Sequence, residues 1–224
     1  MKAIVLHEYG PPSNLKLEDV DDPKPGPGEI LIRVSATSVN PIDYKMRAGK
    51  AFPVTFPAIL GYDVAGIVRE LGEGVTGFTI GDRVFCRTGS AYAELAVAKA
   101  SEVAHVPEGV ELTTAAALPV VCTTADQLIR DAVKAQSGQT ILLTGTLGSV
   151  GRCALFCALS LGVKVIAGVR KKQIDEAKSL GAIEAIDITD DDAIARLGTL
   201  DAVADTIGGP LSAKLLSKVK PGGY

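Results

Sequence analysis

The 224-residue sequence predicts an α/β protein in which an antiparallel, barrel-like β domain precedes a doubly wound parallel sheet. Two contrasting patterns lead to this fold class. Up to about Pro107, short runs rich in Val and Ile alternate with turn-forming stretches such as "DDPKPGPGE" and "GEGVTG", which is typical of antiparallel strands. From about Gly138, short apolar runs alternate with amphipathic stretches, which is typical of parallel strands joined by right-handed crossover helices.

The expected elements follow one another in a simple order. In the first half, the main strands are expected at "AIVL", "EILIRVSATSV" and "VAGIVREL". The linking segment "TTAAALPVVCTTADQLIRDAVKA" is expected to be helical, with an interruption at Pro119. The second half is expected to alternate between strands and helices through "TILLTG", "SVGRCALFCALSL", "VKVIAGV", "KQIDEAKSL", "IEAIDI", "DDAIARL" and "LDAVADT". We therefore place the two domains at residues 1–117 and 118–224.

The composition indicates a soluble globular protein, with 47% hydrophobic and 22% charged residues. A net charge of -3 offers no general attraction to nucleic acids or anionic membranes. The first apolar run, "AIVL", ends at His7, far short of a secretory signal, and the longest one is broken by Gly162 and Lys164. We therefore expect a cytoplasmic protein without a membrane partner. Nucleic-acid binding is disfavoured, since only a local basic patch such as "RKK" would support it.

The four cysteines, Cys86, Cys122, Cys153 and Cys157, form no CxxC pair and have no His at ligand spacing. A metal site is therefore not expected. Cys153 and Cys157 are expected on one helix face among Ala and Leu, where thiols most often serve as packing groups.

The stretch "TGTLGSVG" carries Gly145, Gly148 and Gly151 directly after an apolar strand and before an apolar helix. Its GxxGxxG spacing differs from the usual GxGxxG dinucleotide fingerprint. In this strand-to-helix context, however, glycines let the backbone approach a pyrophosphate, and the following helix offers unpaired N–H groups to it. The pattern favours a phosphate-binding turn, and the alternative is a tight turn in an α/β protein without a nucleotide.

The next strand ends in "GVRKK", from Gly168 to Lys172, which contains three cations and no acid. An NAD site usually has an Asp or Glu there to bind the ribose 2′-hydroxyl, so this stretch favours NADPH over NADH. Arg170 is the main candidate for the 2′-phosphate, with Lys171 or Lys172 as a helper. The alternative is a solvated helix start, although cations at a helix N-terminus oppose the helix dipole.

Ordered motifs along the whole chain carry a family resemblance. They are "KAIVLHEYG", "NPIDYKMRAG", "GYDVAGIV", "GDRVF", "AYAELAVA", "AAALPV", "GSVG", "SLGA", "DTIGG" and "KPGG". In these motifs the chain resembles the zinc-independent quinone oxidoreductase branch of the medium-chain dehydrogenase/reductases, which includes zeta-crystallin. The resemblance implies a GroES-like catalytic domain followed by a Rossmann domain, with NADP(H) as cofactor and no zinc. The places of the catalytic zinc ligands in other members are occupied by "NPID" and "GYD".

The same resemblance implies roles for individual residues. Asn40 and Asp43 of "NPID" would line the pocket near the nicotinamide, and Thr124 and Thr206 would contact the cofactor. The pyrophosphate would be held by Gly148, Ser149, Val150 and Gly151. For Asn40 an ordinary turn before Pro41 remains an alternative, and for Thr124 a helix cap does.

Three positions depart from the family pattern and leave the substrate open. Tyr44 and Lys45 follow "NPID" at once, Asp126 replaces an aromatic residue of the linking helix, and Ile188 stands where a tyrosine is often found. We expect Tyr44 to donate a hydrogen bond to the acceptor oxygen.

The expected reaction is hydride transfer from NADPH to a small electron-poor acceptor, a quinone or an α,β-unsaturated carbonyl compound. The alternatives are an enoyl-thioester reductase of the same superfamily and a non-catalytic NADPH-binding protein. Only about four parallel strands can be counted before "KPGGY". The Rossmann domain is therefore expected to be incomplete at its C-terminus, and a homodimer is expected for a full-length chain.

Overall fold

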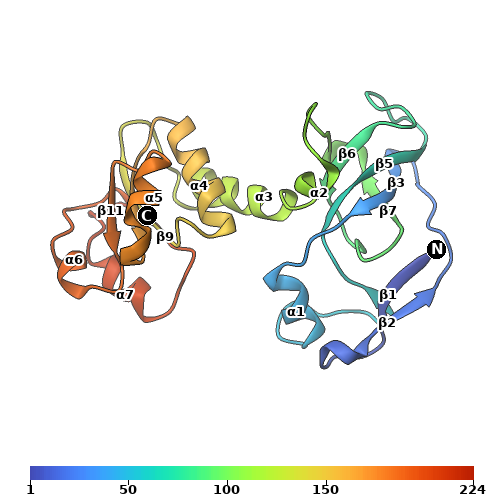
Figure 1. The fold of residues 1–224 in the computed structure, drawn as a ribbon, viewed down its shortest axis with the longest axis horizontal. Helices are drawn as coiled ribbons and strands as arrows, with labels where there is room; N and C mark the ends of the chain where they lie inside the picture. The colour runs from blue at the N-terminus through green and yellow to red at the C-terminus, as the bar shows by residue number, and fades with distance from the viewer. The chain divides into compact units, whose positions relative to one another are not determined.

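The computed structural model describes residues 1–224 and consists of two compact units, Met1–Val120 and Val121–Tyr224. Most of their helices and strands are labelled in Figure 1. The first unit contains two antiparallel sheets and the second a single parallel sheet. The predicted combination of an antiparallel β domain with a doubly wound parallel sheet is confirmed.

The larger sheet of the first unit has five strands in the order β7-β3-β5-β6-β8. Their bounds are Glu29–Ala36 for β3, Asp63–Leu71 for β5, Arg83–Arg87 for β6, Leu95–Lys99 for β7 and Val103–His105 for β8. Fully buried side chains of β3 and β5, such as Ile30, Ile32, Val64 and Val68, form the core of this sheet. Their i, i+2 and i, i+4 spacing places them on one face, because successive strand residues point to opposite faces.

The smaller sheet of the first unit has the order β2-β1-β4. Its strands are Lys2–Leu6 for β1, Leu15–Asp19 for β2 and Ala58–Ile59 for β4. Two helices complete the unit, α1 at Pro41–Arg47 and α2 at Leu112–Ala115. Pro41 is the first residue of α1, where its missing N–H has no helical partner to lose.

The second unit contains the parallel sheet, in the order β11-β10-β9-β12. The strands are Thr140–Thr144 for β9, Lys164–Val169 for β10, Glu184–Asp187 for β11 and Ala202–Ala204 for β12. The helices are Ser149–Ser160 for α4, Ile174–Ser179 for α5, Asp191–Ala195 for α6 and Pro210–Leu216 for α7. Strands and helices alternate as predicted, with β9 in the interior of the sheet.

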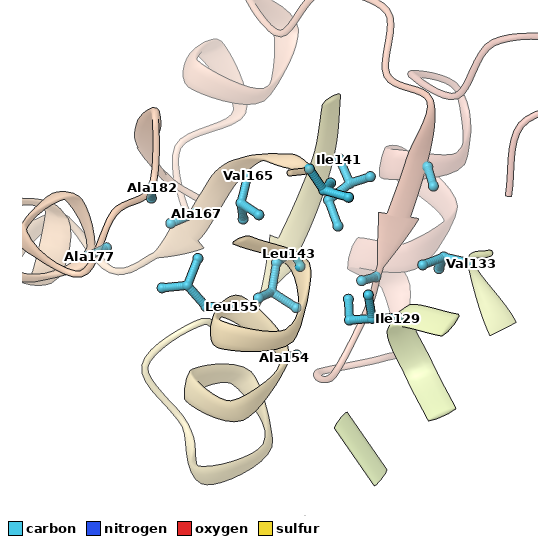
Figure 2. Close-up of a cluster of buried hydrophobic side chains, with 14 of the residues drawn as sticks. Ile129, Val133, Ile141, Leu143, Ala154, Leu155, Val165, Ala167, Ala177 and Ala182 are labelled. Carbon is cyan, nitrogen blue, oxygen red and sulfur yellow. The ribbon is translucent and has the colours of Figure 1, made fainter. Parts of the chain in front are cut away.

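Both faces of this sheet are covered by apolar side chains, which explains the continuous apolar run in β9. Ile141 and Leu143 belong to a cluster on one face that includes Leu155 of α4. Figure 2 shows these side chains, together with Val165 of β10, gathered beside α4. Leu142 points to the other face and packs with Leu215 of α7. A strand buried on both faces has no need for alternating polarity.

Helix α3, Pro119–Gln127, runs across the division between the two units and continues into a π-helical turn at Leu128–Ala132. The stretch Leu112–Ala132 is long and apolar enough to cross a membrane by length and composition alone. Ala125 and Ile129 are nevertheless fully buried in the protein core of the second unit. Asp126 and Arg130 form an ion pair at 2.7 Å on the same stretch. Length and composition alone are therefore weak evidence that this stretch crosses a membrane.

Candidate cofactor and substrate sites

A tight turn joins β9 to α4 and contains the predicted glycines. Gly145 has φ +61°, a left-handed conformation that side chains other than glycine adopt rarely. Its N–H donates to the carbonyl of Gly168 on β10 at 3.0 Å, and the N–H of Gly148 donates to the carbonyl of Gly145 at 2.8 Å. Gly148 is the N-cap of α4 and is exposed, so the first turn of α4 begins at the protein surface.

Two of these glycines are required by packing. A Cβ on Gly145 would collide with the hydroxyl of Thr206, and a Cβ on Gly151 would collide with the carbonyl of Gly145. Gly151 is buried, whereas Ser149 is exposed and Val150 is half-buried against the core. The surface that a phosphate could reach is therefore formed by Gly148 and Ser149, with the N–H groups of the first turn of α4 behind it.

A cavity of about 320 Å³ opens beside this turn. It is lined by Gly145, Leu147, Gly148, Gly168, Val169, Arg170, Gln173, Ile188 and Ile207. The structure thus brings together four residues that were predicted to bind the cofactor: Gly145, Gly148, Gly168 and Arg170. A Cβ on Gly168 would lie 2.7 Å from Cγ2 of Ile188, so this glycine lets β10 pass close to Ile188. The lining contains one cation, Arg170, and no carboxylate, which is the composition predicted for an NADPH site.

The two lysines next to Arg170 lie elsewhere. Lys171 lines a different cavity of about 580 Å³, together with Asp187 and Asp190. Hydrogen bonds from the hydroxyl and the N–H of Thr189, with a contribution from Lys171, lower the pKa of Asp187. Lys172 is exposed and lines neither cavity. Of the three cations, Arg170 alone lines the glycine cavity.

Thr206 lies in the loop directly after β12, next to the glycine turn. Its hydroxyl donates to the carbonyl of Thr144 at 2.8 Å, and its N–H donates to the hydroxyl of Thr144 at 3.0 Å. Because Thr144 ends β9, these two bonds hold the start of the loop after β12 against the end of β9. Thr206 itself is exposed.

Asp205 anchors the same loop. Its carboxylate accepts hydrogen bonds from the hydroxyls of Thr144 and Ser212 and from the N–H groups of Ile207 and Gly208. Burial alone would raise the pKa of Asp205, but the bonds from Ser212 and Thr144 and the two amides outweigh it and lower the pKa to about 2. The ionised carboxylate therefore organises residues 206–208 at the carboxyl ends of the strands, where ligands bind in such sheets.

Thr124 lies within α3 and is exposed. It belongs to the second unit and occupies the sixth position of the helix, so it is not the N-cap that was considered as an alternative.

In the first unit, Asn40 and Asp43 organise the start of α1. Asn40 is the N-cap, and its N–H donates to Oδ2 of Asp43 at 2.7 Å. The hydroxyl of Tyr92 donates to the same oxygen at 2.9 Å. Asn40 and Asp43 are 7% and 3% exposed, whereas Tyr44 on the next helical position is 51% exposed. Of these three predicted residues, the structure leaves Tyr44 accessible.

Burial of the Asp43 carboxylate raises its pKa, against the opposing effect of the bonds from Asn40 and Tyr92. Nearby Asp63 contributes to the increase. Oδ1 of Asp43 is buried and has no hydrogen-bond partner.

Asp63, at the start of β5, is completely buried and connects three segments of the first unit. Its Oδ2 accepts hydrogen bonds from the hydroxyl of Ser38 and from Nδ2 of Asn40, the latter at 2.7 Å. Its Oδ1 accepts a hydrogen bond from the N–H of Val120 at 2.7 Å. Val120 is the second residue of α3, so Asp63 satisfies one of the N–H groups that a helix leaves unpaired at its N-terminus.

The sequence prediction missed Asp63, Tyr92 and Asp205 as parts of the candidate sites. Asp63 and Asp205 stand in the motifs "GYDVAGIV" and "DTIGG", each at an end of an apolar strand. An acid in that position could have been recognised as a loop-anchoring group. No group of three or more His, Cys, Asp or Glu side chains that could hold a metal ion is present.

Comparison with known proteins identifies the family. The alcohol dehydrogenase GroES-like domain family matches residues 26–108. A quinone oxidoreductase from Pseudomonas aeruginosa is 35% identical over 88% of this chain and 61% of its own length. An acryloyl-coenzyme A reductase from Sulfurisphaera tokodaii is 30% identical over 100% of this chain and 75% of its own length.

A solved structure extends the likeness to three dimensions. The Escherichia coli quinone oxidoreductase complexed with NADPH has a TM-score of 0.84 at 27% identity, covering 98% of this chain and 70% of that one. The chain spans 61% of the Pseudomonas aeruginosa relative, which is less than two thirds of its length. The chain belongs to the quinone oxidoreductase, zeta-crystallin-like branch of the medium-chain dehydrogenase/reductase superfamily.

Proposed function

We propose that this protein is an NADPH-dependent oxidoreductase that transfers a hydride to a small electron-poor acceptor, a quinone or an α,β-unsaturated carbonyl compound. The observation that carries the proposal is the glycine-lined cavity that has Arg170 and no carboxylate in its lining. A 2′-phosphate needs a cation, whereas a free 2′-hydroxyl is usually bound by an acid. The NADPH complex of the Escherichia coli relative supports the same cofactor.

Different residues of the second unit would bind different parts of the cofactor. Gly148, Ser149, Val150 and Gly151 would offer the helix N-terminus to the pyrophosphate. Arg170 would pair with the 2′-phosphate, and Gly145 and Gly168 would keep the backbone close to the ribose and phosphates. Lys171 and Lys172 would add positive charge farther from the cavity. NADPH, when bound, supplies the hydride, and the protein supplies orientation and electrostatics.

Thr124, near the start of the second unit, and Thr206, near its end, would both contact the cofactor. Asp205 would act as a positioning residue, since its hydrogen bonds fix the loop that carries Thr206. Zinc has no part in the proposed reaction.

In the first unit, we assign the contact with the acceptor to Tyr44, because its side chain is exposed whereas Asn40 and Asp43 are buried. Its hydroxyl would donate a hydrogen bond to the acceptor oxygen on which negative charge develops. Asn40 and Asp43 would act mainly by fixing the start of α1 and thus the position of Tyr44. Tyr44→Phe is expected to lower kcat/KM about tenfold, the loss of one such bond. If the Tyr44→Phe variant turns over every acceptor at an unchanged rate, Tyr44 does not have this role.

An enoyl-thioester reductase is the second candidate, favoured by the likeness to acryloyl-coenzyme A reductase over the whole of this chain. The two enzyme candidates share the cofactor and differ in the acceptor. A non-catalytic NADPH-binding protein would share the cofactor site alone.

The deciding experiment titrates NADPH and NADH against the protein and then follows the loss of reduced nicotinamide with quinones, enones and enoyl thioesters. Tighter binding of NADPH together with turnover of a quinone or an enone is the expected result. Turnover confined to thioesters would establish the second candidate, and binding without any turnover would establish the third. Tighter binding of NADH would overturn the assignment of Arg170.

A further inference from the structure

Two thiols of the second unit are in contact. Cys122 belongs to α3 and Cys153 to the second turn of α4, and their Sγ atoms are 3.6 Å apart, close enough for one thiol to donate a hydrogen bond to the other. Both side chains are half-buried at the edge of the core. The proposed reaction uses neither of them.

The packing around the pair keeps the sulfurs together. Ala125, one turn after Cys122, and Ala154, next to Cys153, are both completely buried in the same apolar cluster. The two helices therefore cannot separate without opening the core. A disulfide has an S–S length of about 2.05 Å, so the Sγ atoms would need to approach by roughly 1.5 Å from their present distance. A change of side-chain rotamers with a small shift of one helix covers such a distance.

The other two cysteines are less suited to oxidation. Cys86 is 3% exposed on β6, and burial raises its pKa to about 12. Cys157 lies one turn after Cys153, and its pKa is raised first by burial and then by the carboxylate of Asp126. The thiolate is the reactive form of cysteine, so a raised pKa makes both groups slower to react. Cys86 serves as an unreactive thiol within the same chain.

We propose that Cys122 and Cys153 are a redox-sensitive modification site that closes reversibly to an intramolecular disulfide, with a hydroperoxide as oxidant. One thiolate attacks the peroxide oxygen, the O–O bond breaks, and a sulfenic acid forms while water or an alcohol leaves. The second thiolate then attacks the sulfenic sulfur, the S–S bond forms, and hydroxide leaves as water. The two sulfurs together lose two electrons, which reduce the peroxide. A small thiol reverses the reaction by exchange.

The test oxidises the whole 224-residue protein with hydrogen peroxide in stoichiometric steps and blocks the remaining thiols with an alkylating agent. Mass spectrometry of unreduced peptides then maps the linkage. The expected product is a monomer lighter by two hydrogens, with Cys122 joined to Cys153, Cys86 unmodified, and full recovery after dithiothreitol. This mapping requires neither NADPH nor an acceptor. Its result therefore tests the disulfide separately from the proposed function.

Matched variants make the assignment specific. Cys122→Ser and Cys153→Ser each abolish the intramolecular linkage, whereas Cys157→Ser, on the same helix face as Cys153, leaves it intact. Circular dichroism checks that each variant is folded. If a variant does not fold, the disulfide map of the wild-type protein decides the test. A linkage through Cys157, cross-linked dimers, or stepwise oxidation to sulfinic acid without a linkage would overturn the proposal.

Discussion

The hydroxyl of Thr206 fills the space that a Cβ on Gly145 would need. The same hydroxyl donates to the carbonyl of Thr144 at 2.8 Å, so the ends of β9 and β12 and the glycine turn form one interlocked group. Changes to any of these residues are therefore expected to affect the stability of the second unit as well as the binding of the proposed cofactor.

Gly145→Ala tests the steric part of this relationship. Gly145 has φ +61° and no room for a methyl group, so the substitution adds a collision to the backbone strain. We expect a loss of about 3 kcal/mol in the free energy of unfolding, measured by urea denaturation. Gly138→Ala is the control, because Gly138 has φ +83° with nothing within 4 Å of its Cβ position, and about 1 kcal/mol is expected there. Equal losses would show that packing against Thr206 is unimportant.

Asp205→Asn tests the electrostatic anchor of the same loop. The pKa of Asp205 is lowered to about 2 in the folded protein, below the value of about 3.9 for an unfolded chain. Its contribution to stability is therefore complete above pH ~4 and is lost as the pH falls through about 2. At pH 7 the variant is expected to be less stable by about 2 kcal/mol, and this difference should shrink between pH 4 and pH 2. A difference that is independent of pH would contradict the assignment.

Arg170→Ala tests the choice of cofactor. Arg170 lines the glycine cavity, and removing its charge should weaken NADPH binding about 10- to 100-fold, while NADH binding changes less than about twofold. Fluorescence titration of both cofactors measures the ratio. Lys178→Ala, an exposed lysine on α5 outside this lining, is the matched control and should leave both affinities unchanged. Equal weakening of NADPH and NADH would assign Arg170 to the pyrophosphate instead.

Asp63→Ala tests the buried carboxylate of the first unit. The substitution removes the buried carboxylate to which Nδ2 of Asn40 and the N–H of Val120 donate, so a loss of about 3 kcal/mol in the free energy of unfolding is expected. Asp63→Asn keeps an acceptor oxygen and should lose less. Asp19→Ala removes an exposed carboxylate on β2 and should change stability by less than about 0.5 kcal/mol. If Asp63→Ala is as mild as Asp19→Ala, the three hydrogen bonds are not stabilising.

The thiol pair leads to a further prediction that depends on both proposals. Closing the disulfide draws Cys153 toward α3, and Cys153 follows Gly151 by two residues in the helix that would hold the pyrophosphate. Because the helix N–H groups must point at the phosphates, oxidation is expected to weaken NADPH binding several-fold. Titration of oxidised and reduced protein measures the change, with Cys122→Ser as the variant that should not respond to oxidant. If the affinity for NADPH is unchanged after complete disulfide formation, the thiol pair does not influence the cofactor site.

Local patterns predicted much of the fold and part of the site. The period of apolar residues located β9, α4 and β10, and the glycines with Arg170 were recognised because short-range sequence determines a strand-to-helix turn. The pairing of Asn40 with Asp43 also had a local signal, since an N-cap residue followed three positions later by an acid is typical of a helix start. The sequence could not show whether either of the two lysines after Arg170 lines the glycine cavity, because the directions of their side chains depend on how the chain leaves β10.

Tertiary contacts accounted for what was missed. Asp63 and Val120 are 57 positions apart, and Cys122 and Cys153 are 31 positions apart. Asp205 meets Thr144 across 61 positions. No periodicity or spacing rule reports such pairs, because they form when the sheet order and the helix packing are already in place.

Helix α3 has a consequence for attempts to exchange domains between relatives. Its first turn is anchored by Asp63 of the first unit, and its later residue Ala125 is buried in the core of the second. A crossover placed between Val120 and Val121, where the units divide, would join the first two residues of α3 from one relative to the remaining seven from the other. Chimeras that take α3 together with its partner at position 63 should express as folded protein more often than those cut at the division itself.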